Sequence, residues 1–311
     1  MKNLITGGSG FIGSNLTEKL LLNGEEVICI DNLSSGNFNN IKKWENSKNF
    51  QFINLDIANF LRESFNFKID RIWHLACPGS PKKYQKEPIK TSKTIILGLF
   101  NLLDYAYKNE SQFLFASSSE IYGNPIEHPQ KENYFGNVNP IGIRSCYEEG
   151  KRMSESICTD FKNTYKLPIK IARIFNSYGP RMLRNDGRVI SNFICQALDK
   201  KPLTIYGDGS QTRSFCFIDD LIGGLIKLMD SDYSNPINIG SDEEISIRDL
   251  SKMIHDKLEL EEKTQNMSLP LDDPKKRKPD ISLAKKILDW QPKVKLNKGL
   301  DLTINFLKNN Q

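Results

Sequence analysis

Near its start the chain reads TGGSGFIG, from Thr6 to Gly13, between an apolar run at Asn3 to Thr6 and a helical pattern at Gly13 to Asn23. A second apolar run, Glu26 to Asp31, follows, and this is the rhythm of a βαβ unit. Glycines in such a turn let backbone N–H groups approach a pyrophosphate, which also meets the positive end of the helix. Because an acidic residue, Asp31, ends the second strand, the stretch predicts a dinucleotide-binding site.

Asp31 indicates which dinucleotide to expect. Its carboxylate can accept hydrogen bonds from both adenosine ribose hydroxyls and would repel a 2′-phosphate, so NAD is favoured over NADP. The loop that follows, Ser34-Ser35-Gly36, supplies no Arg or Lys that would bind such a phosphate. Asp56 ends the next strand and has two readings, an adenine-side contact or a simple helix N-cap. The expected cofactor contacts are Gly7, Gly10, Phe11, Ile12, Gly13, Asp31, Asn32, Ser35, Gly36, Asp56, Ile57 and Leu75.

The first half of the chain continues this alternation of strands and helices. Further strands are predicted at Phe50 to Leu55, Arg71 to Leu75, Gln112 to Ala116 and Ile169 to Ile174, and the longest helices at Ile89 to Lys108 and Cys146 to Lys166. The strands are almost unbroken apolar runs, which is typical of a doubly wound parallel α/β sheet of the Rossmann type. Turn-rich stretches after Phe175 predict a smaller mixed α/β region. We expect an NAD-binding domain at residues 1–176 with about 215–240, and a substrate domain at 177–214 and 241–311.

Composition narrows the class of protein. The 311 residues carry a net charge of +5, spread along the chain, so a nucleic-acid partner is not expected. The six cysteines form no C-x-x-C pair and have no histidine cluster near them, so we expect reduced thiols and no metal site. No apolar run is long enough to span a bilayer, and the apolar pattern begins almost at Met1, which leaves no room for a signal peptide. The sequence therefore predicts a cytoplasmic protein without a membrane partner.

A catalytic pair is predicted on one helix. Tyr147 and Lys151 are four residues apart, so their side chains share a helix face. Tyrosine, with an unperturbed pKa of about 10, acts as a base near pH 7 only if its phenolate gains roughly 4 kcal/mol of preferential stabilisation. The ammonium of Lys151 and the cationic nicotinamide are suited to supply it. Ser118 follows a predicted strand, at the end where ligands bind in such sheets, and its hydroxyl can hold the substrate oxygen.

These features occur together with longer motifs that run through the chain. They include His74 to Pro81, Pro88 to Thr91, Asn139 to Gly142, Cys146 to Arg152, Ala172 to Asn176, Asn185 to Val189, Gly209 to Arg213 and Asp272 to Asp280. With these motifs the sequence resembles the UDP-glucuronate decarboxylase (UDP-xylose synthase) family of extended short-chain dehydrogenases over essentially its whole length. The run from Cys146 to Arg152 and the last segment are the specific ones, whereas many sugar-nucleotide epimerases and dehydratases share the glycine turn.

The resemblance implies a role for each matching residue. Tyr147 would be the base, Lys151 its partner and a ligand of the nicotinamide ribose, and Ser118 the donor to the substrate oxygen, in a position where the family usually has threonine. Glu120 and Arg277 match positions tied to decarboxylation. The substrate contacts it implies are Lys93 and Asn101 in the sugar pocket, Asn176, Arg188, Tyr206 and Arg213 at the nucleotide diphosphate, and Arg277. A homodimer paired through the two long helices is also implied.

The implied reaction is oxidation of UDP-glucuronate at C4 by NAD, loss of carbon dioxide from the β-keto acid, and return of the hydride to give UDP-xylose. Two other classes stay open. A UDP-sugar 4-epimerase or 4,6-dehydratase would use the same Tyr147, Lys151 and NAD, although dehydratases usually place an aspartate at the position of Ser119. A non-catalytic NAD-binding module is a more remote alternative, because such proteins tend to lose the tyrosine and the lysine.

Overall fold

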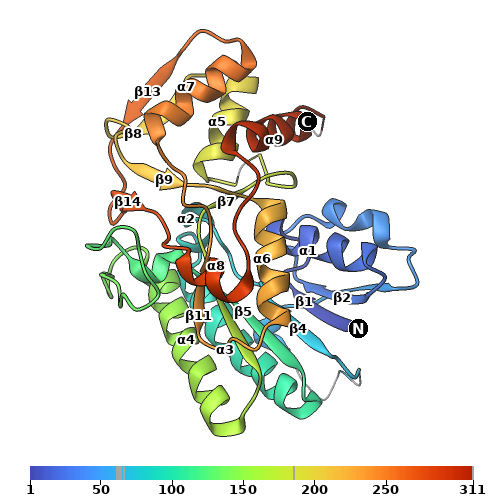
Figure 1. Cartoon of the computed structure of the whole chain (residues 1–311). Helices are drawn as coiled ribbons and strands as arrows, with labels where there is room; N and C mark the ends of the chain where they lie inside the picture. The colour runs from blue at the N-terminus through green and yellow to red at the C-terminus, as the bar shows by residue number, and fades with distance from the viewer. Residues whose placement is uncertain (61–64, 66, 185, 310–311) are drawn as a thin grey trace.

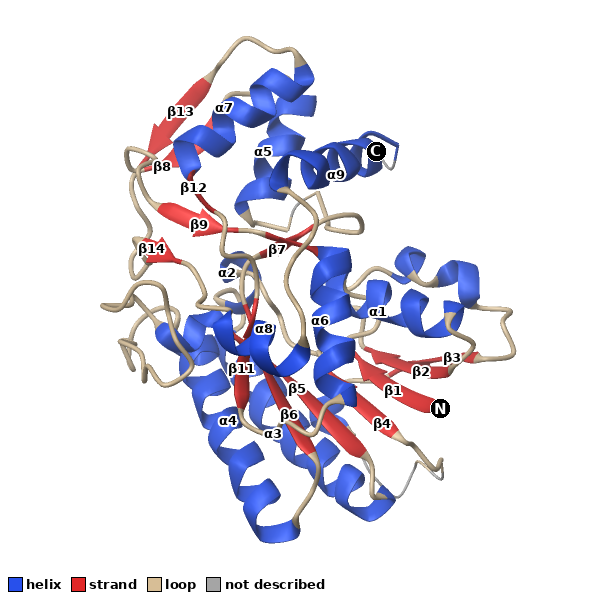
Figure 2. Ribbon diagram, in the orientation of Figure 1, coloured by secondary structure: helices blue, strands red, loops and turns tan. Residues whose placement is uncertain are grey.

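A seven-stranded parallel sheet forms the centre of the protein in a computed structural model that describes residues 1–60, 65, 67–184 and 186–309 (Figure 2). Its strands, in spatial order, are β11 (Pro236–Ile239), β6 (Ile169–Ile174), β5 (Gln112–Ser118), β4 (Arg71–His74), β1 (Lys2–Thr6), β2 (Glu26–Asp31) and β3 (Phe50–Asn54). Every neighbouring pair is parallel. The predicted doubly wound Rossmann-type sheet is thus confirmed, and the direction of winding reverses between β1 and β4.

Helices cover both faces of the sheet (Figure 1). On one face lie α3 (Pro88–Asn109) and α4 (Ser145–Tyr165), and on the other α1 (Phe11–Leu22) and α6 (Ile218–Asp230). Successive side chains of a strand point to opposite faces of the sheet, so each strand contributes to both cores. Phe113 and Phe115 of β5 belong to the core under α3 and α4, and Leu114 between them belongs to the core under α1 and α6. Burial of both faces explains why these strands are continuous apolar runs.

The second region lies above the carboxyl edge of the sheet in Figure 1. It contains α5 (Val189–Leu198), β8 (Leu203–Tyr206), α7 (Ile247–Leu258), β13 (Thr264–Met267) and α9 (Leu296–Asn309), with a small sheet of β12 (Glu244–Ser246), β9 (Thr212–Ser214) and β14 (Lys276–Arg277). Short strands β7 (Ser177–Tyr178) and β10 (Cys216–Phe217) pair beneath it, and α8 (Ser282–Leu288) packs against β11.

One hydrophobic core connects the two regions. The apolar residues under α1 and α6, such as Leu16 and Leu221, belong to the same cluster as Phe193 of α5 and Leu250 of α7. The smaller mixed α/β region predicted after Phe175 is therefore present, but it shares its core with the sheet. The proposed division into an NAD domain and a substrate domain at the stated residue limits stays a prediction. Within the described residues, no helix is both long and apolar enough to cross a membrane.

Candidate active site

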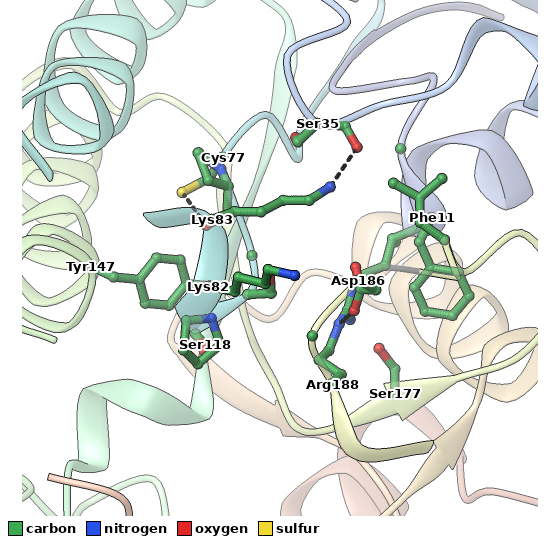
Figure 3. A pocket seen from close by; sticks show the side chains of 18 of the residues that line it. Phe11, Ser35, Cys77, Lys82, Lys83, Ser118, Tyr147, Ser177, Asp186 and Arg188 are labelled. Atoms are coloured by element: carbon green, nitrogen blue, oxygen red, sulfur yellow. Dashed lines mark hydrogen bonds and ion pairs between the residues drawn. The ribbon is translucent and has the colours of Figure 1, made fainter. Parts of the chain in front are cut away.

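A cavity of about 1080 Å³ opens at the carboxyl edge of the sheet, where the strand order reverses between β1 and β4. Its lining combines the glycine turn after β1, the loops after β2, β4 and β5, the start of α4, and residues of the second region. Figure 3 shows part of it, with Tyr147 and Ser118 at one end and Phe11 and Arg188 at the other. Ligands of open α/β sheets bind at such a switch point.

The glycine turn is shaped for a closely approaching ligand. Gly7 has a φ of +73°, and a Cβ there would lie 2.8 Å from Cα of Ala76. A Cβ at Gly13 would lie 2.1 Å from the carbonyl oxygen of Gly7, so a side chain would push the helix off the turn. Gly10 is the N-cap of α1, which leaves first-turn N–H groups without a capping side chain. These residues fit a dinucleotide pyrophosphate at the start of α1.

The loop after β2 holds the acidic residue in place. Asp31 accepts hydrogen bonds from the backbone N–H of Ser9 (3.1 Å) and of Leu33 (2.8 Å). The amide of Asn32 donates to Asp56 at 2.9 Å. Asp56 also accepts from the N–H of Ala58 (3.0 Å) as the N-cap of a short 3₁₀ helix, Ile57–Asn59, so its capping role is present, and it lines the cavity as well. All the residues predicted to contact NAD line this one cavity: Gly7, Gly10, Phe11, Ile12, Gly13, Asp31, Asn32, Ser35, Gly36, Asp56, Ile57, Leu75 and Lys151.

Tyr147 and Lys151 lie on one face of α4, facing the end of β5. Tyr147 is hydrogen-bonded to the hydroxyl of Ser118. The Nζ atom of Lys151 donates to the carbonyl of Ala116 at 2.7 Å and lies 5.7 Å from the ring centroid of Tyr147. Burial raises the pKa of the Tyr147 phenol, and the bond to Ser118 opposes this only in part; burial also lowers the pKa of Lys151. The geometry of the expected base and its partner is present, but the ammonium alone does not lower the pKa of the phenol.

Glu120 and Arg277 form a buried ion pair beside Tyr147. Arg277 donates from Nη1 to Oε1 of Glu120 at 3.3 Å, and its Nη2 donates to the carbonyl of Gly123 at 3.4 Å. The same carboxylate oxygen accepts from Nη2 of Arg144 at 2.7 Å. Although burial acts in the opposite direction, these two guanidinium groups lower the pKa of Glu120. The Nε atom of Arg277 is buried and has no hydrogen-bond partner among the described residues, and the residue itself lines the cavity.

Sequence reasoning missed two residues of this cluster. Arg144 donates to Glu148 (3.1 Å) and to Asp273 (3.2 Å) as well as to Glu120, and it links the start of α4 to the loop before β14. Tyr84, the last residue of the short helix α2 (Pro81–Tyr84), stacks on the ring of Tyr147 with centroids 4.8 Å apart and donates to Glu120 at 3.1 Å. Tyr84 lies shortly after the His74 to Pro81 motif, and Arg144 lies just before the Cys146 to Arg152 motif. Closeness to these motifs is the one feature of the sequence that pointed to either residue.

Most predicted substrate residues also line the cavity: Asn176, Arg188, Tyr206, Arg213 and Arg277. Arg213 donates to Asp273 at 2.9 Å, and its pKa is lowered to about 10, chiefly by burial. Arg188 forms an ion pair with Asp186 and places its guanidinium 5.4 Å from the ring centroid of Phe11. The two predicted groups of contacts, cofactor and nucleotide diphosphate, therefore meet at Phe11 and Arg188. Asn185, part of a quoted motif, lies outside the described residues.

Lys93 and Asn101 are the exceptions, and here the expectation needs correction. Neither lines the cavity. Lys93 is exposed on α3, whereas Thr91 and Thr94 of the same helix line the cavity. On a helix, a shift of one or two residues is enough to point a side chain away from the cavity. Asn101 lies two turns further along and donates instead to the carbonyls of Ile57 (3.0 Å) and Ala58 (3.3 Å). In this structure Asn101 holds the 3₁₀ helix after β3.

Comparison with known proteins identifies relatives that match nearly the whole chain. The profile of a protein family described as GDP-mannose 4,6 dehydratase matches residues 4–303. Arabidopsis thaliana UDP-glucuronic acid decarboxylase 6 is 47% identical over 303 residues, 97% of this chain and 87% of the relative. Xenopus tropicalis UDP-glucuronic acid decarboxylase 1 is 46% identical over 305 residues, 98% of this chain and 72% of the relative.

A solved structure of the same architecture carries ligands. It is UDP-glucuronic acid 4-epimerase from Bacillus cereus in complex with UDP-glucuronic acid and NAD, which superposes with a TM-score of 0.92, at 31% identity and over 100% of both chains. Residues across the sheet and the second region therefore share their arrangement with a protein that binds both a dinucleotide and a nucleotide sugar.

Proposed function

We propose a function for this chain on the ground that it belongs to the UDP-glucuronic acid decarboxylase family: it converts UDP-glucuronate to UDP-xylose and carbon dioxide, with NAD as a recycled cofactor. The observation that carries the proposal is a single cavity that joins the Ser118, Tyr147 and Lys151 set to the buried pair of Glu120 and Arg277. The first set suits oxidation and reduction of a hydroxyl group, and the second adds carboxylate chemistry beside it.

The proposed sequence of steps gives each of these side chains a task. NAD, when bound in the glycine turn, would supply the acceptor and later the donor of the C4 hydride. Tyr147 takes the proton of the C4 hydroxyl, and Ser118 donates a hydrogen bond to the oxygen on which charge develops. The resulting β-keto acid loses its carboxylate as carbon dioxide, and the enolate is protonated at C5. Tyr147 then returns its proton to the C4 oxygen during reduction.

Arg277 and Glu120 are proposed to act at the carboxylate stage. Arg277 lines the cavity, and its guanidinium group is suited to the substrate carboxylate or to the diphosphate. Glu120 is ionised, because the arginines lower its pKa, and it holds Arg277 through the Nη1 atom. Asn176, Arg188, Tyr206 and Arg213 are proposed to bind the UDP part at the other side of the cavity.

Two properties of the whole molecule belong to the same proposal. Leu97, Phe100 and Tyr107 of α3 and Met153 and Tyr165 of α4 are 40% to 53% exposed and form an apolar patch on the long helices. We expect a homodimer to bury this patch, since apolar patches of this kind mark protein interfaces; light scattering at several concentrations tests it. All six cysteines are unpaired, which fits the reducing conditions of the cytoplasm.

The deciding experiment is NMR of the products formed from UDP-glucuronate by the purified protein, with carbon dioxide followed in parallel. The expected result is a UDP-pentose with one carbon dioxide per turnover, and Tyr147→Phe is the matched inactive control. Formation of UDP-galacturonate without carbon dioxide would replace the proposal by 4-epimerisation. No reaction with any nucleotide sugar, despite NAD binding, would favour a non-catalytic NAD-binding module.

A further inference from the structure

A hydrogen bond crosses the mouth of the cofactor site. The Nζ atom of Lys83, on α2, donates to the backbone carbonyl of Ser35 at 3.1 Å, and Figure 3 shows the lysine side chain extended toward it. Lys83 lies in the segment after β4, and Ser35 lies in the loop after β2. Because β4 and β2 flank β1 in the sheet, a bond between these two segments passes over the glycine turn that follows β1.

The lysine side of this bond is firmly held. Tyr84, next to Lys83, is fully buried, stacks on Tyr147, and accepts a hydrogen bond at its carbonyl from the hydroxyl of Thr91 (3.2 Å). The N–H of Lys83 donates to the carbonyl of Ser80 at 2.9 Å. Lys82 packs against Gly187, whose added Cβ would lie 3.2 Å from the Cβ of Lys82. The position of Lys83 is therefore tied to the catalytic tyrosine and to the segment that carries Arg188.

The serine side is held more lightly. The loop from Asn32 to Gly36 leaves the sheet through Leu33, which has a φ of +57°. Ser34 donates to the side chain of Asn32 (3.0 Å), and Asn37 donates to the carbonyl of Ser9 (3.2 Å). Each of these bonds stays within the β1–β2 half of the site. Lys83 donates a hydrogen bond from the opposite rim to this loop. It thereby connects the loop after β2, which has few bonds of its own, to the well-packed segment of α2.

The charge of Lys83 also suits this place. Its side chain lines the cavity together with Lys82, beside Asp186 and Arg188. Burial lowers the pKa of Lys83, and the nearby Asp186 carboxylate opposes that change. A dinucleotide pyrophosphate in the glycine turn below would be a second anionic neighbour for this ammonium.

We propose that Lys83 is a positioning residue that keeps the dinucleotide in its cleft throughout one turnover, by bridging the two rims over the glycine turn. The inference rests on the proposed function and deepens it. In the first half-reaction the C4 hydride passes to NAD⁺ and the hydroxyl proton to Tyr147; in the last the same hydride and a proton return to C4 and its oxygen. Between the two, carbon dioxide leaves and C5 takes a proton from solvent, so loss of NADH at that point leaves UDP-4-keto-pentose, carbon dioxide and NADH as products. Retention by Lys83 therefore decides which product the enzyme releases.

The test is the rate at which NADH leaves the full-length protein without sugar, measured by its fluorescence after a chase with excess NAD⁺. Lys83→Met is expected to release NADH about fivefold faster than wild type, a factor within the range of one hydrogen bond. Lys83→Arg, which keeps the charge and a donor, is expected to restore most of the retention. Lys86→Met is the matched control, because it removes a charge from the exposed part of the same rim without touching Ser35. Urea unfolding of each variant verifies that it is folded.

Product analysis gives a second readout. With UDP-glucuronate, Lys83→Met is expected to release severalfold more UDP-4-keto-pentose and NADH per carbon dioxide than wild type does. Equal NADH release rates for Lys83→Met and wild type would overturn the role of Lys83 and leave the decarboxylase function standing. Faster NADH release in this variant, in a protein that forms no carbon dioxide, would overturn the decarboxylase function and leave the retaining role standing. A wild type that does not bind NADH would overturn both.

Discussion

Glu148 gives a direct test of the electrostatics around Tyr147, the proposed base. Its side chain is buried next to Tyr147 on α4, and Oε1 accepts from Nε of Arg144 at 3.1 Å. Burial and the neighbouring charge of Glu120 outweigh this ion pair, and together they raise the pKa of Glu148 from 4.5 to about 7. We predict that Glu148→Gln stabilises the protein at pH 8 and weakens the pH dependence of its stability.

The magnitude follows from proton linkage. Since one pKa unit corresponds to 1.36 kcal/mol, ionising Glu148 in the folded state costs about 3 kcal/mol more than in the unfolded chain. The pKa of Glu148 is higher in the folded protein than in the unfolded chain, so binding of its proton stabilises the folded state. This stabilisation is fully present below about pH 4.5 and is lost as the pH rises through 7. Glutamine stays neutral and keeps the oxygen that accepts from Arg144. At pH 8, Glu148→Gln is therefore expected to raise the free energy of unfolding by up to about 3 kcal/mol. Loss of the charge that pairs with the Arg144 guanidinium reduces this gain.

The assay is urea unfolding at several pH values from 5 to 8, for wild type, Glu148→Gln and Glu149→Gln. Glu149 is the matched control, because it is the next residue on the same helix but its side chain is 40% exposed and pairs with Arg152. Glu149→Gln is expected to follow wild type at every pH. If Glu148→Gln also shows the pH dependence of wild type, Glu148 does not change its protonation in this range and the reasoning is wrong.

Three further changes test separate parts of the site. Tyr147→Phe is expected to lower kcat about 1000-fold in a carbon dioxide assay, since it removes a general acid–base, while NADH binding persists; near-normal turnover would mean another group is the base. Asp31→Ala is expected to weaken NADH binding at least tenfold in a fluorescence titration, because it removes the charged acceptor of the ribose hydroxyls; unchanged affinity would contradict that role. Arg144→Met unpairs Glu120 and Glu148 in the interior and is expected to lower the free energy of unfolding by about 3–5 kcal/mol in urea; a loss below 1 kcal/mol would count against the buried network.

The sheet was predictable because its signals are local. β1, α1 and β2 follow from the glycine turn and the two apolar runs, and β4 to β6 are largely apolar runs that both layers of helices bury. β11 escaped prediction because Pro236 and Asn238 interrupt its apolar run. Asn238 is fully buried there, and it accepts from the hydroxyl of Tyr122 at 2.8 Å and donates to the carbonyl of Gln130 at 3.0 Å. A buried polar residue of this kind can be identified only once its partners, far away in sequence, are known.

Site residues could be predicted where a short motif determines the position of the side chain. They could not be predicted where packing between distant segments determines it. Tyr147, Lys151 and the glycine turn belong to short local patterns. Arg144 and Tyr84 act through contacts made in three dimensions, which composition and spacing do not reveal. Lys93 and Asn101 failed for the same reason, since the resemblance identifies the helix but not the direction in which each of its residues points.

The surroundings of Tyr147, the proposed base, bear on how this side chain could lose its proton. Burial raises the pKa of the phenol, and the ammonium of Lys151 donates to the carbonyl of Ala116 and has its own pKa lowered by burial. We therefore expect Tyr147, the proposed base, to stay protonated until a further positive charge enters the cavity, and the oxidised nicotinamide ring would be such a charge. If Lys83 retains the dinucleotide as proposed, it would also keep beside Tyr147 the positive charge that favours the phenolate.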